Sequence, residues 1–203
     1  MFITFEGQEG AGKSTQIKLL YDYFLAKGVD VILTREPGGT DIAEKIRHIL
    51  KDTDNAAMSA KAEALLYIAA RAQLADEVIL PHLARGGVVL SDRFTDSTIA
   101  YQGFGNGLNV DELVSMSNFA GDSLVPDITF YLKIDVEAGL ARKLAEGAPD
   151  RIEQRSLSYH MAVKKGYEFL LRMYPERIFA VDGSLPQNEI HEIITKHIEG
   201  KRN

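Results

Sequence analysis

The fold of this chain is decided by the stretch Gly7-Gln8-Glu9-Gly10-Ala11-Gly12-Lys13-Ser14, which follows the apolar run Phe2–Phe5. It fits the pattern G-x-x-x-x-G-K-[ST], whose glycines let backbone N–H groups turn inward and approach phosphate oxygens. Lys13 brings a positive charge to the β- and γ-phosphates of a nucleotide, and the Ser14 hydroxyl can ligate Mg²⁺. The next residues, Thr15–Ala26, are predicted to form a helix whose N-terminus faces the anion. The stretch therefore predicts a nucleotide site between a strand and a helix.

The composition limits the class of protein to which this chain can belong. Its 203 residues suit one domain, and contents of 45% hydrophobic and 26% charged residues are ordinary for a globular protein. The net charge of −6 argues against a general nucleic-acid or membrane binder, and the lack of cysteine excludes disulfides and thiolate sites. Strand-like sequence from residue 2 and the absence of a long apolar run predict a cytoplasmic protein without a signal peptide or membrane span.

Short β-branched runs alternate with longer helical stretches, which is typical of a parallel sheet with helices on both faces. The predicted strands are Phe2–Glu6, Asp30–Thr34, Val88–Ser91, Asp127–Ile134 and Arg177–Val181. The predicted helices are Lys13–Ala26, Ile42–Leu50, Ser59–Ala84, Val110–Ala120, Val136–Ala145, Ile152–Arg172 and Gln187–Ile198. We expect a single α/β domain over residues 1–203 with a five-stranded parallel sheet. Its ligands should lie beyond the carboxyl ends of the strands.

Charged residues follow the second and third predicted strands. Arg35 and Glu36 precede a Pro-Gly-Gly turn, and Arg35 can clamp a second phosphate, although a surface ion pair explains it equally well. Asp92 follows an apolar run, as in the Walker-B arrangement whose carboxylate supports Mg²⁺, and Arg93 would enter the same cleft. The alternative is that Asp92 and Arg93 cap the next element.

Two further segments carry groups that suit a planar base. Tyr67 and Arg71 lie one turn apart on the predicted helix face that also holds Glu63, so a ring and a guanidinium can hold a base there. A partly exposed helix face is the alternative. Ser97 and Gln102 offer donors and acceptors for the edge of a base, whereas an ordinary polar loop would have the same composition.

Cations flank a predicted flexible break at Ala145–Asp150. Arg142 and Lys143 precede the break, and Arg151 follows it. This arrangement fits a lid over about residues 140–155 that closes over the phosphates and excludes water. An exposed helical hairpin with solvated charges fits the same spacing.

Taken in order, the segments GQEGAGKS, TREPGGT, AEALLYIAAR, SDRFTDSTIAYQG and DRIEQ resemble those of bacterial-type thymidylate kinases, over about residues 2–160. The resemblance implies a P-loop nucleoside monophosphate kinase fold with a short helical lid. It also implies transfer of the ATP γ-phosphoryl group to dTMP, giving dTDP and ADP, with Mg²⁺ and in a homodimer. A kinase for another nucleoside monophosphate and a P-loop switch that hydrolyses nucleotide are the rival interpretations.

The resemblance implies roles for individual residues on the acceptor side. The implied dTMP-binding residues are Glu9, Arg35, Tyr67, Arg71, Arg93, Ser97, Tyr101 and Gln102. Glu9 would accept a hydrogen bond from the sugar 3′-hydroxyl, and Tyr101 lies where the family checks for a 2′-hydroxyl. Tyr67 would stack on thymine, while Arg71, Ser97 and Gln102 approach the base and Arg35 and Arg93 surround the phosphate.

On the donor side, the resemblance implies that ATP binds residues Gly7 to Ser14 and that Arg142 stacks on adenine. The implied catalytic residues are Lys13, Asp92, Arg93 and Arg151, with Ser14 and Asp92 at the metal. Leu144 and Glu146 stand where some relatives place lid arginines. The positive charge that neutralises the transferring phosphoryl group would therefore come from Arg151, Lys143 or Arg93.

Overall fold

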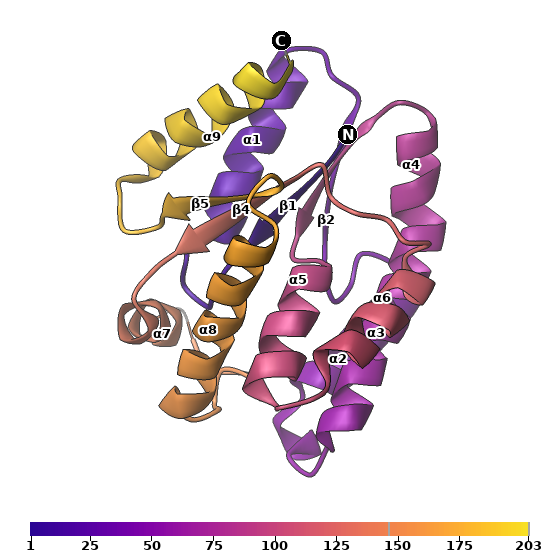
Figure 1. Ribbon diagram of the computed structural model, residues 1–203, viewed down its shortest axis with the longest axis vertical. Helices are drawn as coiled ribbons and strands as arrows, with labels where there is room; N and C mark the ends of the chain where they lie inside the picture. Colours follow the sequence, from indigo (N-terminus) through magenta and orange to yellow (C-terminus); the bar gives the residue numbers. More distant parts are fainter. Residues whose placement is uncertain (146, 203) are drawn as a thin grey trace.

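A five-stranded parallel β-sheet lies at the centre of the computed structural model, which describes residues 1–145 and 147–202 (Figure 1). The strands are β1 (Phe2–Glu6), β2 (Val31–Arg35), β3 (Val88–Asp92), β4 (Ile128–Lys133) and β5 (Ile178–Asp182). Their spatial order is β2-β3-β1-β4-β5, and every neighbouring pair is parallel. This confirms the predicted parallel sheet, since each strand lies within one residue of its expected bounds.

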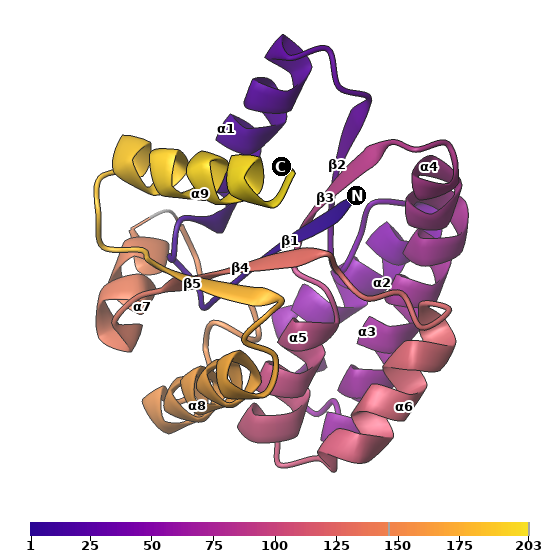
Figure 2. The same ribbon diagram turned by 45° about the horizontal axis from the view of Figure 1, so that its top comes forward.

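Helices cover both faces of the sheet, as predicted. Figure 2 shows α1 (Lys13–Ala26) and α9 (Gln187–Arg202) on one face, with the remaining layer of helices on the other. That layer contains α3 (Ala60–Leu74), α4 (Leu80–Ala84), α5 (Thr95–Thr98), α6 (Val110–Ala120) and α8 (Leu157–Met173). Of two more helices, α2 (Asp41–Lys51) packs against α3, and α7 (Val136–Leu144) packs against α8. Within the described ranges, no helix is long and apolar enough to cross a membrane.

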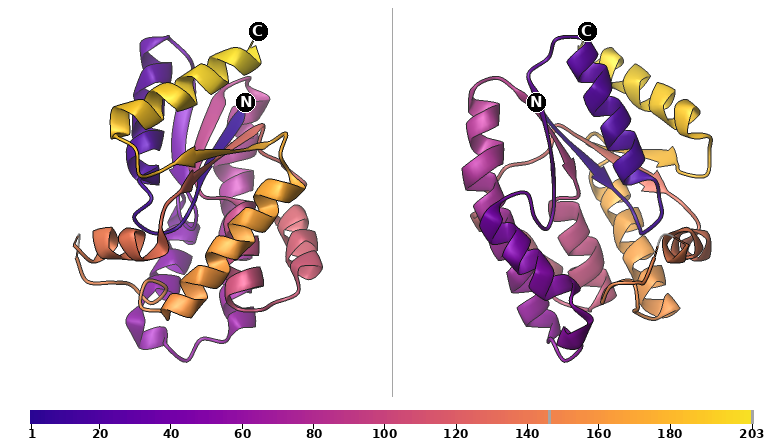
Figure 3. Two further views of the ribbon diagram at one scale, coloured as in Figure 1. Left: turned by 60° about the vertical axis from the view of Figure 1, so that its left-hand side comes forward. Right: turned by 180° about the vertical axis from the view of Figure 1, so that it is seen from behind.

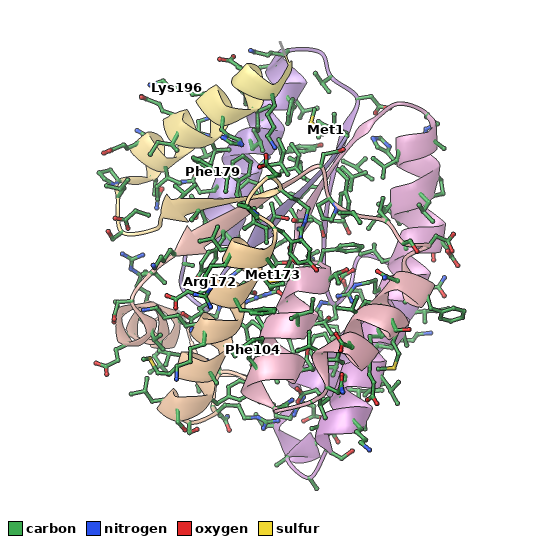
Figure 4. The ribbon with its side chains drawn as sticks, viewed as in Figure 1. Met1, Phe104, Arg172, Met173, Phe179 and Lys196 are labelled. Atoms are coloured by element: carbon green, nitrogen blue, oxygen red, sulfur yellow. The ribbon has the colours of Figure 1, made fainter. Side chains whose placement is uncertain are left out.

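The core has a layer on each face of the sheet because side chains alternate along buried strands. In β4, Phe130 and Leu132 pack in the cluster with α1 and α9, whereas Tyr131 faces α8. Tyr131 stacks there on Tyr167, with ring centroids 5.0 Å apart. The side chains drawn in Figure 4 fill the space between sheet and helices, while Lys196 points outward from α9. Both faces of β4 are therefore buried, which explains its continuous apolar sequence.

Two expected helices are divided or begin later than predicted, and α9 continues past its expected end at Ile198 to Arg202. The predicted helix Ser59–Ala84 is divided into α3, a π-helical turn at Ala75–Ile79 and α4. The predicted helix Ile152–Arg172 begins only at Leu157, because the Ser156 side chain caps it by accepting from a backbone N–H. The residues before Ser156 form a separate turn, so the prediction of a helix from Ile152 is wrong.

The polar segment after Arg93 is helical rather than a loop. It forms α5 and then a π-helical turn over Ile99–Gly105. α8 packs closely against this turn, because Gly166 has no side chain; a Cβ there would lie 2.8 Å from the Ala100 Cα. Such π turns are frequent at functional sites, and this one carries Tyr101 and Gln102.

Candidate active site

The loop between β1 and α1 adopts a conformation that requires glycine. Gly7, Gly10 and Gly12 have φ angles of 139°, 68° and 86°, in the left-handed region that favours glycine. The loop also packs directly on α7: a Cβ on Gly10 would lie 2.1 Å from the Gly139 carbonyl oxygen. Both views in Figure 3 show α7 beside this loop and away from the chain termini. The sequence motif thus forms a compact backbone cradle at the carboxyl end of β1, the central strand of the sheet.

Lys13 is buried at the start of α1, with its ammonium group inside the cradle. Its Nζ donates to the Gln8 carbonyl oxygen at 2.8 Å. Burial, together with the nearby Arg93 guanidinium, lowers the pKa of Lys13 to about 8. A bound phosphate would favour the charged form, so the cradle is suited to an anion.

Ser14 and Asp92 bring two oxygen atoms together beside the cradle. The Ser14 Oγ donates to the Asp92 Oδ2 at 3.0 Å, and Asp92 ends β3 opposite Phe5 of β1. Hydroxyl and carboxylate oxygens are ligands that Mg²⁺ accepts, so the two residues fit this ion. The described residues contain no group of three or more His, Cys, Asp or Glu that could hold a metal.

The Arg93 side chain forms hydrogen bonds with several segments around the cavity. Its Nη1 donates to Ser97 Oγ and Tyr167 OH, both at 3.1 Å. Its Nη2 donates to Glu9 Oε1 at 3.2 Å and to Tyr101 OH at 3.1 Å, and the Tyr101 hydroxyl donates to the same Glu9 oxygen at 2.7 Å. Arg93 itself has a φ of 77°, an unfavourable backbone conformation that the surrounding contacts maintain. Protein groups therefore hold the guanidinium in one orientation.

The buried side chain of Glu6 holds two of the Arg93 partners, Ser97 and Tyr167, by hydrogen bonds. It accepts hydrogen bonds from Phe94 N–H at 2.8 Å, Ser97 Oγ at 2.6 Å and Tyr167 OH at 2.9 Å. Burial, together with the Asp96 carboxylate, raises the pKa of Glu6 to about 7. Since Ser97 and Tyr167 are also partners of Arg93, the Glu6 carboxylate orients the groups that orient the guanidinium.

Arg71 and Arg35 differ in how they are held. Arg71 is fully buried and binds both carboxylate oxygens of Glu36, with its Nη2 at 2.6 Å from Oε2, and donates to Ser117 and Thr98. Arg35 is half-exposed and pairs with Glu44 at 2.8 Å. Its surface ion pair matches the alternative that the sequence left open.

Gln102 lines the cavity and is oriented by Glu63. The Gln102 Nε2 donates to Glu63 Oε1 at 3.0 Å, which leaves its amide oxygen available to a ligand. Glu63 is fully buried and also pairs with Arg151 and Arg155 at 2.7 and 3.1 Å. Tyr67, one turn along α3, lines the cavity, and burial raises its pKa.

The expected lid residues have different surroundings. The Arg142 Nη1 lies 3.5 Å from the Gly10 carbonyl oxygen and 3.4 Å from that of Gly183, beside the cradle. Arg151 lies outside the cavity lining and binds Glu63 and the Leu50 carbonyl oxygen. Leu144 is exposed, and Glu146 lies outside the described residues.

One cavity of about 590 Å³ joins the two groups of residues. The predicted site residues that line it are Glu9, Gly10, Ala11, Gly12, Lys13, Ser14, Arg35, Tyr67, Arg71, Asp92, Arg93, Ser97, Tyr101, Gln102 and Arg142. Gly7, Gln8 and Arg151 are not part of the lining. Sequence reasoning missed Arg47 and Lys51, two lining cations of α2. Their spacing of four residues puts them on one helix face, a signal that was available.

A phosphate cradle and a rigid arginine-aromatic pocket within one cavity define a class of protein: a P-loop kinase whose acceptor is itself a small nucleotide. The sequence matches the family described as Thymidylate kinase over residues 5–194. The chain belongs to the thymidylate kinase family and is a phosphotransferase.

Individual relatives cover almost the whole chain. The chain is 45% identical to the thymidylate kinase of Bacillus pumilus over 98% of its length and 95% of that protein, and 47% identical to that of Geotalea daltonii over 100% and 98%. The crystal structure of thymidylate kinase from Ehrlichia chaffeensis superposes with a TM-score of 0.79 at 32% identity, covering 98% of each chain. The similarity therefore includes the fold as well as the motifs.

The buried Glu6 makes a prediction about stability and pH. Because its pKa is higher in the folded chain than in the unfolded chain, its stabilising contribution is complete below about pH 4.5 and is lost as the pH rises through about 7. The Glu6→Gln variant lacks this loss. Its free energy of unfolding relative to wild type should rise by up to about 3 kcal/mol between about pH 5 and pH 8. Urea denaturation at each pH measures this difference. The exposed Glu192→Gln variant is the control. A difference for Glu6→Gln that does not change with pH would contradict the raised pKa of Glu6.

Proposed function

We propose that this chain transfers the γ-phosphoryl group of ATP to the 5′-phosphate of dTMP, giving dTDP and ADP. The family membership supports this pair of substrates. The observation that carries the proposal is the single cavity, which runs from Lys13 in the cradle, past Arg93, to Tyr67 and Gln102. Donor and acceptor phosphates bound at its two ends would meet between Lys13 and Arg93.

The chemical step requires little proton transfer. The acceptor phosphate is already ionised near neutral pH because its second pKa is about 6. One of its oxygens forms the new bond to the γ-phosphorus, while the bond to the bridging oxygen of ADP breaks. Catalysis then consists of alignment and charge neutralisation, which the buried Lys13 and the fixed Arg93 supply.

Ser14 and Asp92 are the residues that would hold Mg²⁺. The positive charge supplied there would neutralise part of the phosphate charge. The Ser14 and Asp92 oxygens are already 3.0 Å apart, so little rearrangement of the protein is required.

On the acceptor side, each polar group has a defined direction. Glu9 and Tyr101 would face the sugar, since the Tyr101 hydroxyl and Glu9 Oε1 are hydrogen-bonded at 2.7 Å next to Arg93. Gln102 would read the base edge with the amide oxygen that Glu63 leaves available, and Tyr67 would stack on the base. Arg71 lines the same end, held by Glu36.

The lid segment, about residues 140–155, would supply the remaining charge. Lys143 and Arg142 line the cavity, whereas Arg151 is tied to Glu63 at 2.7 Å. Arg151 would have to leave Glu63 to reach the phosphates. Arg93 and Lys143 are therefore the better-placed donors of charge to the transferring group.

We include the homodimer expected from the resemblance in this proposal. α3 and α6 pack together and expose two large apolar side chains: Phe119 is 89% exposed and Leu65 is 54% exposed. An exposed apolar face on neighbouring helices is typical of a surface that a second copy covers.

The dimer is tested by the mass of the particle in solution. The wild-type chain should have twice the 22.5 kDa of one chain, and Phe119→Glu should shift it toward the monomer, because a charge would be buried in the contact. Light scattering after size-exclusion chromatography measures both masses. Lys196→Glu on the outer face of α9 is the control, and a monomeric wild type would contradict the dimer.

The kinase mechanism is tested by removing the cradle cation. Lys13→Ala should lower kcat by about 10³-fold or more, the scale on which one charge at the transferring phosphoryl group acts. A coupled assay of ADP release with dTMP measures the rate. Lys18→Ala is the matched control, since Lys18 lies on the same helix but is exposed and pairs with Asp22. Near-normal turnover by a folded Lys13→Ala protein would rule out this mechanism.

A further inference from the structure

A buried histidine of α8 faces the acceptor side without a partner. His160 is only 1% exposed, and neither ring nitrogen has a hydrogen-bond partner among the described residues. The Glu9 Oε2 lies 3.6 Å from the His160 Nδ1, slightly beyond hydrogen-bond length. That oxygen is itself buried and lacks a hydrogen-bond partner in the same part of the chain. Leaving buried polar atoms unpaired costs free energy. Two such atoms side by side therefore indicate a hydrogen bond that forms between them in another state of the site.

The backbone already brings His160 and the cradle together. The Gln8 Nε2 donates to the His160 carbonyl oxygen at 2.8 Å, so two successive loop residues, Gln8 and Glu9, contact this one position of α8. This tether keeps the imidazole near the Glu9 carboxylate. Shortening the gap from 3.6 Å to hydrogen-bond length requires a shift of less than about 1 Å.

Among the described residues, the Glu9 carboxylate accepts side-chain hydrogen bonds through Oε1, on the side away from His160. Its Oε1 accepts from Tyr101 and Arg93 at 2.7 and 3.2 Å, toward the cavity, while Oε2 points back to His160. In the neutral tautomer with the proton on Nδ1, the imidazole is a donor aimed at Oε2. A donor on each side would prevent the carboxylate from rotating when a ligand hydroxyl competes for Oε1.

We propose that His160 is a positioning residue for Glu9: its Nδ1–H donates to Oε2 when an acceptor fills the cavity and fixes Oε1 for the sugar 3′-hydroxyl. His160 thereby favours acceptors with a free 3′-hydroxyl over those without it. A site that is built to bond a hydroxyl rejects the analogue lacking it, because the site's own polar group is left unpaired. The inference rests on the proposed function, since it requires Glu9 to face the acceptor sugar.

The test is the preference for dTMP over its 3′-deoxy analogue, measured as the ratio of their Kd values by titration calorimetry. His160→Phe keeps a ring but removes the donor, and should lower this preference about 5- to 30-fold, mainly by weakening dTMP. His160→Asn places an amide nitrogen where Nδ1 was and should restore much of the preference. A purely structural role would weaken both ligands equally and leave the ratio unchanged.

Matched variants separate the possible failures. His82→Phe removes another buried histidine, on α4 and outside the cavity lining, and should leave the ratio at its wild-type value. Glu9→Gln should reduce the preference itself. If Glu9→Gln keeps the full preference, the proposed role of Glu9 is wrong; if Glu9→Gln loses it and His160→Phe does not, the inference about His160 alone is overturned.

Folding of the variants is checked by thermal unfolding. Should His160→Phe not fold, His160→Gln replaces it, because the Gln amide nitrogen matches Nε2 and points away from Glu9. A lower preference for His160→Gln than for His160→Asn supports the role of Nδ1, and equal preferences contradict it.

Discussion

The hydrogen bonds of the Arg93 guanidinium are the interaction on which the rest of the acceptor side depends. Its four oxygen partners, at 3.1–3.2 Å, come from the cradle, from the helical segment after β3 and from α8. One side chain therefore fixes three segments that are far apart in the sequence. A guanidinium suits this role because its planar fork carries several donors and stays charged.

Arg93 also explains the carboxylates that surround it. Glu6 is buried where a charge is costly, and its raised pKa shows that the cost is not fully offset. For Glu9, burial alone would raise the pKa, but the Arg93 guanidinium and then Lys13 outweigh it and lower the pKa below its ordinary value. Two glutamates three residues apart thus have opposite shifts: one supports the network, and the other faces the cavity as an anion.

Sequence reasoning predicted the sheet well because its strands are continuous apolar runs, and the cradle because each of its glycines and Lys13 meets a local physical demand. It was less successful where packing between distant segments decides. The π turn at Ile99–Gly105 depends on the close approach of Gly166 from α8, which leaves no periodic signal. The late start of α8 has a different cause, because the Ser156 cap is a local contact whose signal the sequence offered and the prediction missed.

The candidate site divides in the same way. Residues within the strand-end motifs could be placed from the sequence, since the carboxyl ends of parallel strands meet at one edge of the sheet. The pairing of Arg71 with Glu36 and of Arg151 with Glu63 could not, because each joins residues whose separation in sequence carries no pattern. His160 reads as an ordinary helix residue until α8 is packed against the cradle.

In the proposed function, one cavity unites a donor nucleotide with dTMP. The most direct measurement is ADP release from Mg-ATP with dTMP, dUMP, dCMP, dGMP, AMP or no acceptor added. We expect rapid ADP release with dTMP, accompanied by dTDP, and little release without an acceptor. Equal ADP release with and without an acceptor would contradict it and would assign the cradle to a nucleotide-hydrolysing switch.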